Sequence, residues 1–146
     1  MTQDPPKAKP PKGDQVAISV VDPDEVVRFV LTERMQEIGG NVVGYENLAA
    51  FSDQADPARP GVVVFGPSDK PDEVISQVAG LIGFRPGCGA IMVVYELTAE
   101  VLQGALRAGI DDVVAVTAED TELLDAVSRA AARVNLRRPR RSSSAV

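Results

Sequence analysis

The feature of this sequence that most constrains its fold is a regular alternation between short apolar runs and longer amphipathic stretches. The short runs are rich in β-branched residues, which favour strands, and the longer stretches repeat apolar residues at helical spacing. Each run leads into one helical stretch. Strands that alternate with helices in this way form a parallel sheet covered on both faces, because the crossover between two parallel strands carries a helix.

Five strands and five helical segments are expected from this alternation. The third run, GVVVF from Gly61, is apolar at every position after the glycine, as expected of a central strand that is buried on both faces. We therefore predict an α/β protein with a flavodoxin-like, doubly wound sheet of five parallel strands in the order 2-1-3-4-5. The expected strands are Gln15–Val21, Asn41–Asn47, the run from Gly61, Ala90–Glu96 and Asp111–Val116.

The 146 residues are sufficient for one folded domain, which we expect to span residues 14–136. Residues 1–13 mix proline, lysine and polar residues and predict a disordered leader, and residues 137–146 predict a basic, serine-rich tail or linker. The formal charge of the chain is −6, but the two ends carry +2 and +4, which leaves −12 on the domain. The domain is therefore expected to repel nucleic acid, and only the arginine-rich tail offers a weak membrane contact.

Composition excludes several classes of function. The chain has no histidine and one cysteine, Cys88, so Ser–His–Asp and Cys–His catalysis, the usual zinc sites and an internal disulfide are ruled out. No phosphate-binding glycine loop of either common type occurs, and only 4% of the residues are aromatic. Because the sequence has neither a membrane-length apolar run nor a recognisable leader, we expect a cytoplasmic protein. Because it lacks the catalytic groups and cofactor loops named above, we expect that it is not an enzyme. Cys88 precedes a buried strand and is expected to be a small apolar filler.

Function in open α/β sheets is concentrated at the carboxyl ends of the strands. The residues at these ends are Asp22 and Asp24 after the first strand, Gly66 after the third, Val94 in the fourth and Val116 in the fifth. The acids belong to the tetrapeptide DPDE, whose first aspartate is expected to cap the helix that follows. A helix cap favoured by the helix dipole explains this tetrapeptide better than a metal site does.

Two stretches resemble the receiver domains of two-component response regulators: AISVVDPDE, which begins at Ala17, and ALRAGIDDVVAV, which spans residues 105–116. The similarity covers residues 15–136. The resemblance implies that a working relative transfers a phosphoryl group to an aspartate that ends the third strand, with magnesium held by acids after the first strand. A hydroxyl at the end of the fourth strand and a lysine at the end of the fifth then hold the phosphate, since phosphoryl transfer depends on positioning and charge neutralisation.

At three of these positions the sequence departs from the receiver pattern. Gly66 stands in place of the phosphorylated aspartate, Val94 in place of the hydroxyl and Val116 in place of the lysine. Asp22 and Asp24 are then vestigial metal ligands, because two carboxylates without the third acid bind magnesium weakly at best. We therefore expect no catalytic residue and no cofactor.

The resemblance also implies a partner face. Receivers communicate through the surface formed by the fourth helix, fifth strand and fifth helix, which corresponds here to Thr98–Asn135. We expect this face to bind a protein partner or a second copy of the chain, although its mixed charge is equally typical of a solubilising surface. Its charged residues include Glu100, Arg107, Asp111, Asp112, Glu122, Arg129 and Arg133.

The sequence thus favours a non-catalytic pseudo-receiver that acts as a protein-interaction, dimerisation and regulatory module. It is similar to the N-terminal domains of the TadZ/CpaE group of pilus assembly proteins, in which a receiver-like domain precedes a ParA/MinD-like ATPase. That similarity implies such an ATPase or the pilus machinery as partner.

The alternative hypothesis is a signalling receiver that is switched by phosphorylation or ligand binding through a non-standard acceptor. Asp69 beside Ser68 is the candidate acceptor, although such a pair is more typical of a turn. A small flavodoxin-like enzyme is a third hypothesis, and the missing histidine and cofactor loop argue against it.

Overall fold

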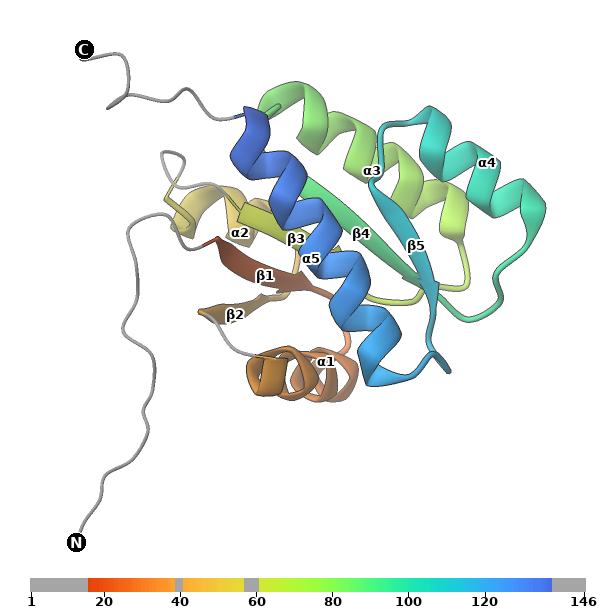
Figure 1. Ribbon diagram of the computed structural model, residues 1–146, viewed down its shortest axis with the longest axis horizontal. Coiled ribbons are helices and arrows are strands. Elements are labelled where there is room, and N and C mark those ends of the chain that lie inside the picture. Colours follow the sequence, from red (N-terminus) through yellow and green to blue (C-terminus); the bar gives the residue numbers. More distant parts are fainter. Residues whose placement is uncertain (1–15, 39–40, 57–60, 138–146) are drawn as a thin grey trace, which may run out of the picture.

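The computed structural model describes residues 16–38, 41–56 and 61–137, and it confirms the predicted alternation of strands and helices (Figure 1). The predicted leader and nearly all of the predicted tail lie outside the described residues. The strands are β1 (Ala17–Val21), β2 (Val42–Tyr45), β3 (Gly61–Phe65), β4 (Gly89–Val94) and β5 (Asp112–Ala115). The helices are α1 (Glu25–Ile38), α2 (Leu48–Gln54), α3 (Pro71–Phe84), α4 (Ala99–Arg107) and α5 (Asp120–Arg137).

The five strands form one parallel sheet in the predicted order β2-β1-β3-β4-β5. In the centre of the sheet Val20 lies beside Val64, and Val64 lies beside Ile91, so the three inner strands stack fully buried β-branched side chains in register. Because all strands run the same way, their carboxyl ends meet at one edge, and this edge carries the residues that the sequence marks as functional.

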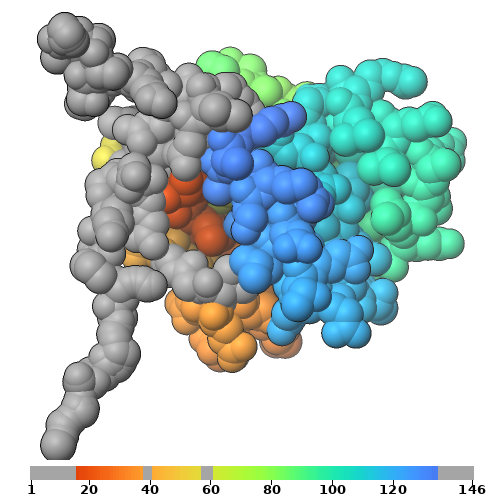
Figure 2. Space-filling model, viewed as in Figure 1, coloured from red at the N-terminus to blue at the C-terminus, as the bar shows by residue number. Residues whose placement is uncertain are grey.

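The sheet separates two apolar clusters. Helices α1 and α5 cover one face, and α2, α3 and α4 cover the other (Figure 1). In the space-filling view, α5 runs across the first of these faces, and α1 lies beside its first turns (Figure 2). Cys88 is buried in the second cluster, as expected of an apolar filler. No helix in the described part of the chain has both the length and the apolar character needed to span a membrane.

The DPDE turn corrects one expectation about how α1 begins. Asp24 caps the helix, since its Oδ1 accepts hydrogen bonds from the backbone N–H groups of Val26 and Val27 at 2.9 and 3.1 Å. The predicted cap, Asp22, lies two residues too early. The helix starts at Glu25, so the Asp22 carboxyl does not cap it.

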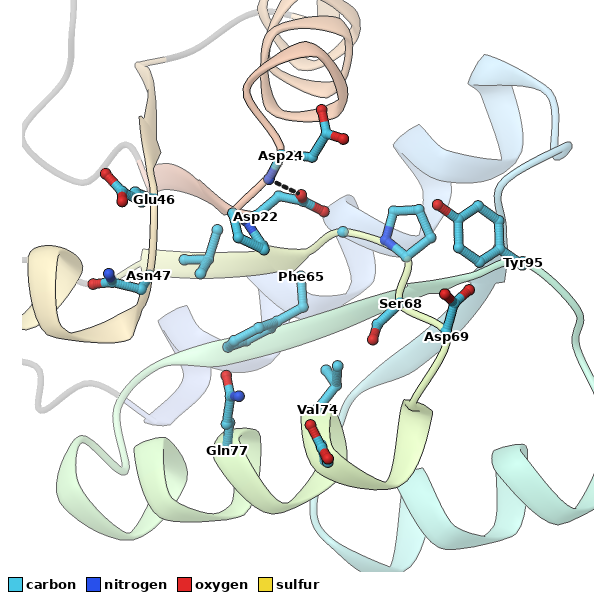
Figure 3. Close-up of a pocket in the computed structure, with 15 residues that line it drawn as sticks. Asp22, Asp24, Glu46, Asn47, Phe65, Ser68, Asp69, Val74, Gln77 and Tyr95 are labelled. Carbon is cyan, nitrogen blue, oxygen red and sulfur yellow. Dashed lines mark hydrogen bonds between the residues drawn. The ribbon is translucent and has the colours of Figure 1, made fainter.

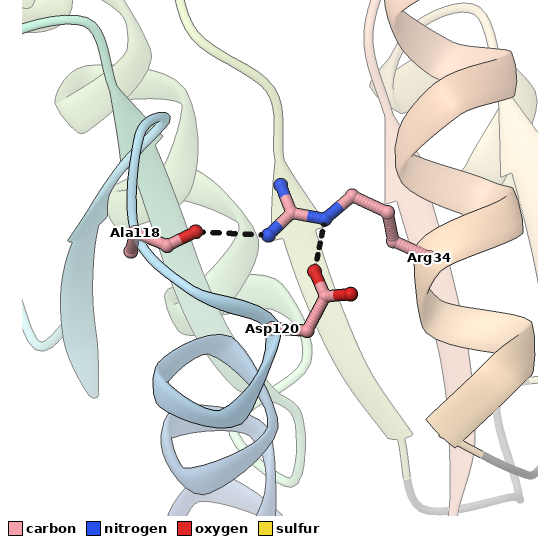
Figure 4. A network of polar contacts seen from close by, with 3 residues as sticks. All are labelled: Arg34, Ala118 and Asp120. Carbon is pink, nitrogen blue, oxygen red and sulfur yellow. Dashed lines mark hydrogen bonds and ion pairs between the residues drawn. The ribbon is translucent and has the colours of Figure 1, made fainter.

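Two further polar contacts fix helix ends. The Thr98 hydroxyl accepts from the N–H of Val101 at 3.1 Å and caps α4, as its sequence position predicts. The Arg34 guanidinium reaches from α1 to the start of α5, where it contacts the Asp120 carboxylate at 2.7 Å and the carbonyl of Ala118 at 3.1 Å (Figure 4). This contact joins the two helices that share one face of the sheet.

Candidate functional site

A pocket of about 490 Å³ opens at the carboxyl edge of β1, β3 and β4, where the sequence predicts the functional site. Glu46 and Asn47, which follow β2, lie on one side of it, and Asp69 and Tyr95 lie on the opposite side (Figure 3). The pocket is lined by Val21, Asp22, Pro23, Asp24, Glu46, Asn47, Phe65, Gly66, Pro67, Ser68, Asp69, Glu73, Val74, Gln77 and Tyr95.

The Asp22 carboxyl occupies the space in which a side chain at position 66 would lie. The register places Val21 beside Phe65, and the N–H of Gly66 donates to the carbonyl of Val21 at 3.0 Å, so the next residues of β1 and β3 are neighbours. A Cβ atom at Gly66 would lie 1.8 Å from Asp22 Oδ2 and 2.7 Å from its Cγ. The Asp22 carboxyl and a side chain at position 66 therefore cannot occupy this space together, so the buried acid requires a glycine at position 66.

The two oxygens of Asp22 differ in their environment. Oδ1 accepts a hydrogen bond from the N–H of Asp24 at 2.7 Å (Figure 3). Oδ2 is buried and has no hydrogen-bond partner among the described residues, and the residue as a whole is 3% exposed.

Burial raises the pKa of Asp22, because the ionised form loses its water, and the nearby charge of Asp24 raises it further. The hydrogen bond from Asp24 N–H and the positive charge of Arg28 lower this pKa and offset part of the effect. Arg28 itself donates to the carbonyl of Asp22 at 2.7 Å, so its nearest contact is with the backbone and not with the carboxyl.

The other two departures from the receiver pattern are apolar residues packed in the core. Val94 ends β4 and is buried in the cluster beneath α3 and α4, while Val116 follows β5 and packs against the cluster on the other face. The N–H of Val116 donates to the carbonyl of Val94 at 2.8 Å. Neither position sends a hydroxyl or an ammonium group toward the pocket.

The vestigial metal ligands do not form a metal centre in the described part of the chain. No group of three or more His, Cys, Asp or Glu side chains there is arranged to hold a metal ion. Asp22 Oδ1 and Asp24 Oδ1 both already accept backbone N–H groups. Ser68 uses its hydroxyl oxygen to accept the N–H of Lys70 at 3.0 Å, and this is the turn contact that its sequence position suggests.

The structure divides the predicted partner-face residues into two groups. Asp112 pairs with Arg129, and Asp111 pairs with Arg133, so four of the seven charges tie β5 to α5 within the chain. Asp111 is also 6% exposed and accepts the N–H of Ala90 at 2.7 Å through Oδ2. The two aspartates are engaged within the chain, while the side chains of Arg129 and Arg133 are more than half exposed, and whether the face binds a partner stays a prediction.

The other three partner-face residues, Glu100, Arg107 and Glu122, are exposed and take part in none of the ion pairs between described residues. Near two of them the structure adds exposed apolar residues that the sequence analysis did not single out. Leu106 in α4 is 52% exposed, and Leu97 is 44% exposed just before the same helix. Exposed apolar side chains mark an interface where they form a contiguous patch with a polar rim.

Two acids of the pocket, Glu46 and Glu73, were also missed. Glu46 follows the second strand, and every parallel strand ends at the same edge, so its position alone could have included it. Glu73 lies in the first turn of α3, and only the packing of this helix brings it to the pocket.

Comparison with solved structures identifies the class of fold. The chain is similar to a candidate pilus assembly-related protein from Burkholderia pseudomallei, with a TM-score of 0.71 and 22% identity over 86% of this chain and 96% of that one. A candidate pilus assembly protein (cpaE) from Burkholderia thailandensis gives 0.67 and 22% over 80% and 98%. A response regulator receiver domain protein from Clostridium thermocellum gives 0.70 and 15% over 83% and 98%.

These similarities confirm the predicted resemblance at the level of the fold: the chain has the flavodoxin-like fold of receiver domains, and proteins related to pilus assembly share it. No protein-family model matches the sequence. No curated protein matches it either.

Proposed function

We propose that this protein is a non-catalytic pseudo-receiver, a regulatory module that acts by binding other proteins and not by phosphorylation of an aspartate. The observation that carries the proposal is the Asp22 carboxyl in the space above Gly66. An acid at position 66 has no room while Asp22 keeps this conformation. The position at which receivers are phosphorylated therefore holds neither an acceptor nor space for one.

The surroundings support the same conclusion. Phosphoryl transfer requires positive charge around the transferred group, from a metal ion and from basic side chains. None of the described residues that line the pocket is basic, and Val94 and Val116 supply no hydroxyl or ammonium. An aspartyl phosphate here would add negative charge to a pocket that already contains five carboxylates, and repulsion disfavours it.

An amide NMR titration with magnesium, followed by magnesium and beryllofluoride, tests the proposal. Beryllofluoride with magnesium mimics an aspartyl phosphate in a working receiver. We expect no saturable shift at Asp22, Gly66 or Val116, because the acceptor is absent. A saturable shift that spreads from these residues to α4 and β5 would show a phosphorylation switch with a non-standard acceptor, and Asp69→Asn would then test the candidate in the loop.

The interaction role is proposed for the face formed by α4, β5 and α5. Its support is the exposed Leu97 and Leu106 together with the exposed charges of Glu100 and Arg107, which form no ion pair with another described residue. Two of the structural neighbours are a candidate pilus assembly-related protein and a candidate pilus assembly protein, and they favour a role in the assembly or localisation of a pilus. A second copy of the chain or a ParA/MinD-like ATPase is the proposed partner.

Sedimentation velocity over a range of concentrations tests the dimer. Leu106→Glu places a charge on the proposed face and is expected to weaken self-association by at least about tenfold. Val26→Glu is the matched control, since Val26 is 70% exposed on α1, which lies on the face of the sheet opposite α4. Equal weakening by both variants would argue against this face. If the wild-type chain does not self-associate, the same pair of variants is tested for binding to the ATPase.

A further inference from the structure

The pocket at the strand ends is acidic, although it lacks the phosphorylation residues of the receiver pattern. Five carboxylates line it, and none of the described lining residues is basic. They come from β1, β2, β3 and α3 or from the loops that follow these strands, so they surround the pocket and do not gather at one point (Figure 3). The five are Asp22, Asp24, Glu46, Asp69 and Glu73.

The buried oxygen of Asp22 is the second observation that points to a ligand. Asp22 lines the pocket, is 3% exposed, and its Oδ2 has no hydrogen-bond donor among the described residues. A buried carboxyl oxygen without a donor is costly, and native structures rarely tolerate one without a reason. A cationic donor that entered the pocket would remove this cost and gain a charge-assisted hydrogen bond.

The surrounding charge favours such a donor. The domain carries a net charge of −12, and a concave site lined by one sign of charge concentrates counter-ions. In the receiver pattern a lysine after the fifth strand supplies a cation to this edge, but Val116 stands at that position and packs into the core. None of the described lining residues supplies a cation in its place, and the nearby Arg28 donates to the Asp22 carbonyl and not to its carboxyl.

A divalent metal ion fits this arrangement poorly. Magnesium takes oxygen ligands in near-octahedral geometry, several of them usually waters, and the described residues contain no group of three or more His, Cys, Asp or Glu side chains that could hold a metal ion. Oδ1 of Asp22 and Oδ1 of Asp24 also already accept backbone N–H groups. Carboxylates spread around a larger space suit a cation with several donors on a longer body.

The apolar lining matches an organic cation. Tyr95 is 54% exposed at the rim beside Asp69, and the face of its ring can hold an ammonium or guanidinium group by a cation–π contact (Figure 3). Val21, Phe65 and Val74 supply apolar surface for an aliphatic stem. Lysine and arginine side chains have this combination of a charged head and an apolar stem.

We propose that the pocket binds a primary ammonium or guanidinium group on an aliphatic stem, with Asp22 as its main acceptor and Tyr95 at the rim. Two sources have this chemistry: a lysine or arginine side chain of a protein partner, and a free amine such as a diamine. This inference concerns the same edge as the proposed function but does not require it, since a pocket without phosphorylation chemistry can bind a cation or remain empty.

Binding must move the Asp22 side chain. Oδ2 is buried, so a ligand reaches it only after the carboxyl turns out of the space above Gly66. That movement breaks or lengthens the hydrogen bond from Asp24 N–H to Oδ1. The amides of Asp24 and Gly66 are therefore the reporters of binding.

The test is an amide NMR titration of the whole chain in two arms at constant ionic strength. One arm uses 1,4-diaminobutane as the free amine, and the other uses a short blocked peptide with a single lysine. We expect saturable shifts of the Asp24 and Gly66 amides with a Kd on the order of 1–10 mM in at least one arm. Saturation in the peptide arm alone assigns the side chain of a partner as the source.

Matched variants separate specific binding from general attraction to an acidic protein. Asp22→Asn keeps the Oδ1 acceptor for Asp24 N–H but removes the charge, and it is expected to weaken binding about tenfold or more. Glu100→Gln, on exposed α4 outside the pocket, removes the same charge and is expected to leave the Kd unchanged. Equal losses in both variants would show only non-specific attraction and overturn the proposal.

Two other outcomes also overturn it. One is the absence of a saturable shift at Asp24 and Gly66 in both arms up to about 50 mM, far above the expected Kd. The other is saturation of the same amides by magnesium alone at a lower concentration, which makes the pocket a metal site. Failure of the proposed function is distinct, because it requires a response to beryllofluoride, and no amine arm contains this reagent.

Discussion

Two acids with buried side chains, one at each end of the sheet, differ in how the protein compensates for the burial of the carboxyl group. Asp111 precedes β5, and Asp22 follows β1; each accepts one backbone N–H at 2.7 Å, Asp111 from Ala90 and Asp22 from Asp24. The second oxygen of Asp111 forms an ion pair with Arg133 of α5, although it accepts no hydrogen bond among the described residues. The second oxygen of Asp22 has neither a hydrogen-bond donor nor an ion-pair partner among the described residues.

The difference separates a structural acid from one that is available for function. A buried carboxylate with a cation and an N–H donor is compensated, and its removal leaves its partners without a counterpart. A buried carboxyl with an oxygen that has neither a hydrogen-bond donor nor a cation beside it costs stability, and it is a candidate for contact with a ligand. Substitutions of these two acids and of their neighbours are expected to differ in their effect on stability in the same way.

The largest effect is expected for Asp111→Ala. The change leaves the buried N–H of Ala90 without its acceptor and Arg133 without its partner, so the free energy of unfolding should fall by about 3 kcal/mol. Urea denaturation at neutral pH measures it. Asp112→Ala is the control, since Asp112 also pairs with an arginine of α5, Arg129, but this arginine is two-thirds exposed. A loss of about 0.5 kcal/mol is expected there, and equal losses would contradict the assignment of Asp111 as a compensated buried acid.

The next effect is expected for Gly66→Ala. The new methyl group would overlap the Asp22 carboxyl, so the free energy of unfolding should fall by about 2 kcal/mol. Asp22→Gly in the same chain removes the overlap, and the double variant Asp22→Gly/Gly66→Ala is expected to recover most of the loss. A double-mutant cycle by urea denaturation gives the coupling. Additive effects would show that the two positions do not compete for the same space.

A smaller effect of opposite sign is expected for Asp22→Asn. Because burial raises the pKa of Asp22 above its ordinary value of 3.8, the folded chain holds this proton at a pH at which the unfolded chain has lost it. The contribution of Asp22 to stability therefore falls as the pH rises through the window between these two pKa values. Asp22→Asn lacks this loss and should be more stable than the wild type at neutral pH by about 1 kcal/mol.

Denaturant unfolding of both proteins between about pH 4 and pH 7 measures the difference. The advantage of Asp22→Asn should grow with pH over this range. A difference that is constant with pH, or that shrinks, would mean that the Asp22 carboxyl is compensated in the folded chain after all. The same experiment on Asp111→Asn should show no such advantage, which sharpens the comparison between the two acids.

Much of the fold follows from the sequence because local patterns carry it. The apolar run of β3 and the helix cap at Thr98 depend on neighbouring residues, and both are confirmed. The site depends on longer distances. That Asp22 fills the space above Gly66 follows from the register of β1 against β3 and from a rotamer, and neither is encoded in the DPDE tetrapeptide.

The same limit applies to the charges of the predicted partner face. Asp111 and Asp112 appear as surface acids in the sequence, and only the packing of α5 on β5 shows that their arginine partners are internal. In the tetrapeptide DPDE the predicted cap is the first aspartate, Asp22; the cap in the structure is Asp24, because the helix geometry begins only after the proline. Sequence patterns thus locate the edge of the sheet that matters, and packing decides what each acid there contacts.

The smallest effect is expected for a substitution of Arg34, which links α1 to α5 on the sheet face that these two helices cover (Figure 4). Asp120 is largely exposed, so its ion pair contributes little, and the contact with the carbonyl of Ala118 adds one hydrogen bond. Arg34→Ala should lower the free energy of unfolding by about 0.5 kcal/mol in urea, with a smaller loss at high salt, because screening weakens the exposed pair. Arg34→Lys keeps the charge but not the forked geometry, and it should recover only part of the loss. A loss as large as that of Asp111→Ala would mean that the exposure of a polar contact does not predict how much it stabilises this protein. The burial of Asp22 would then be no basis for distinguishing it from the other acids.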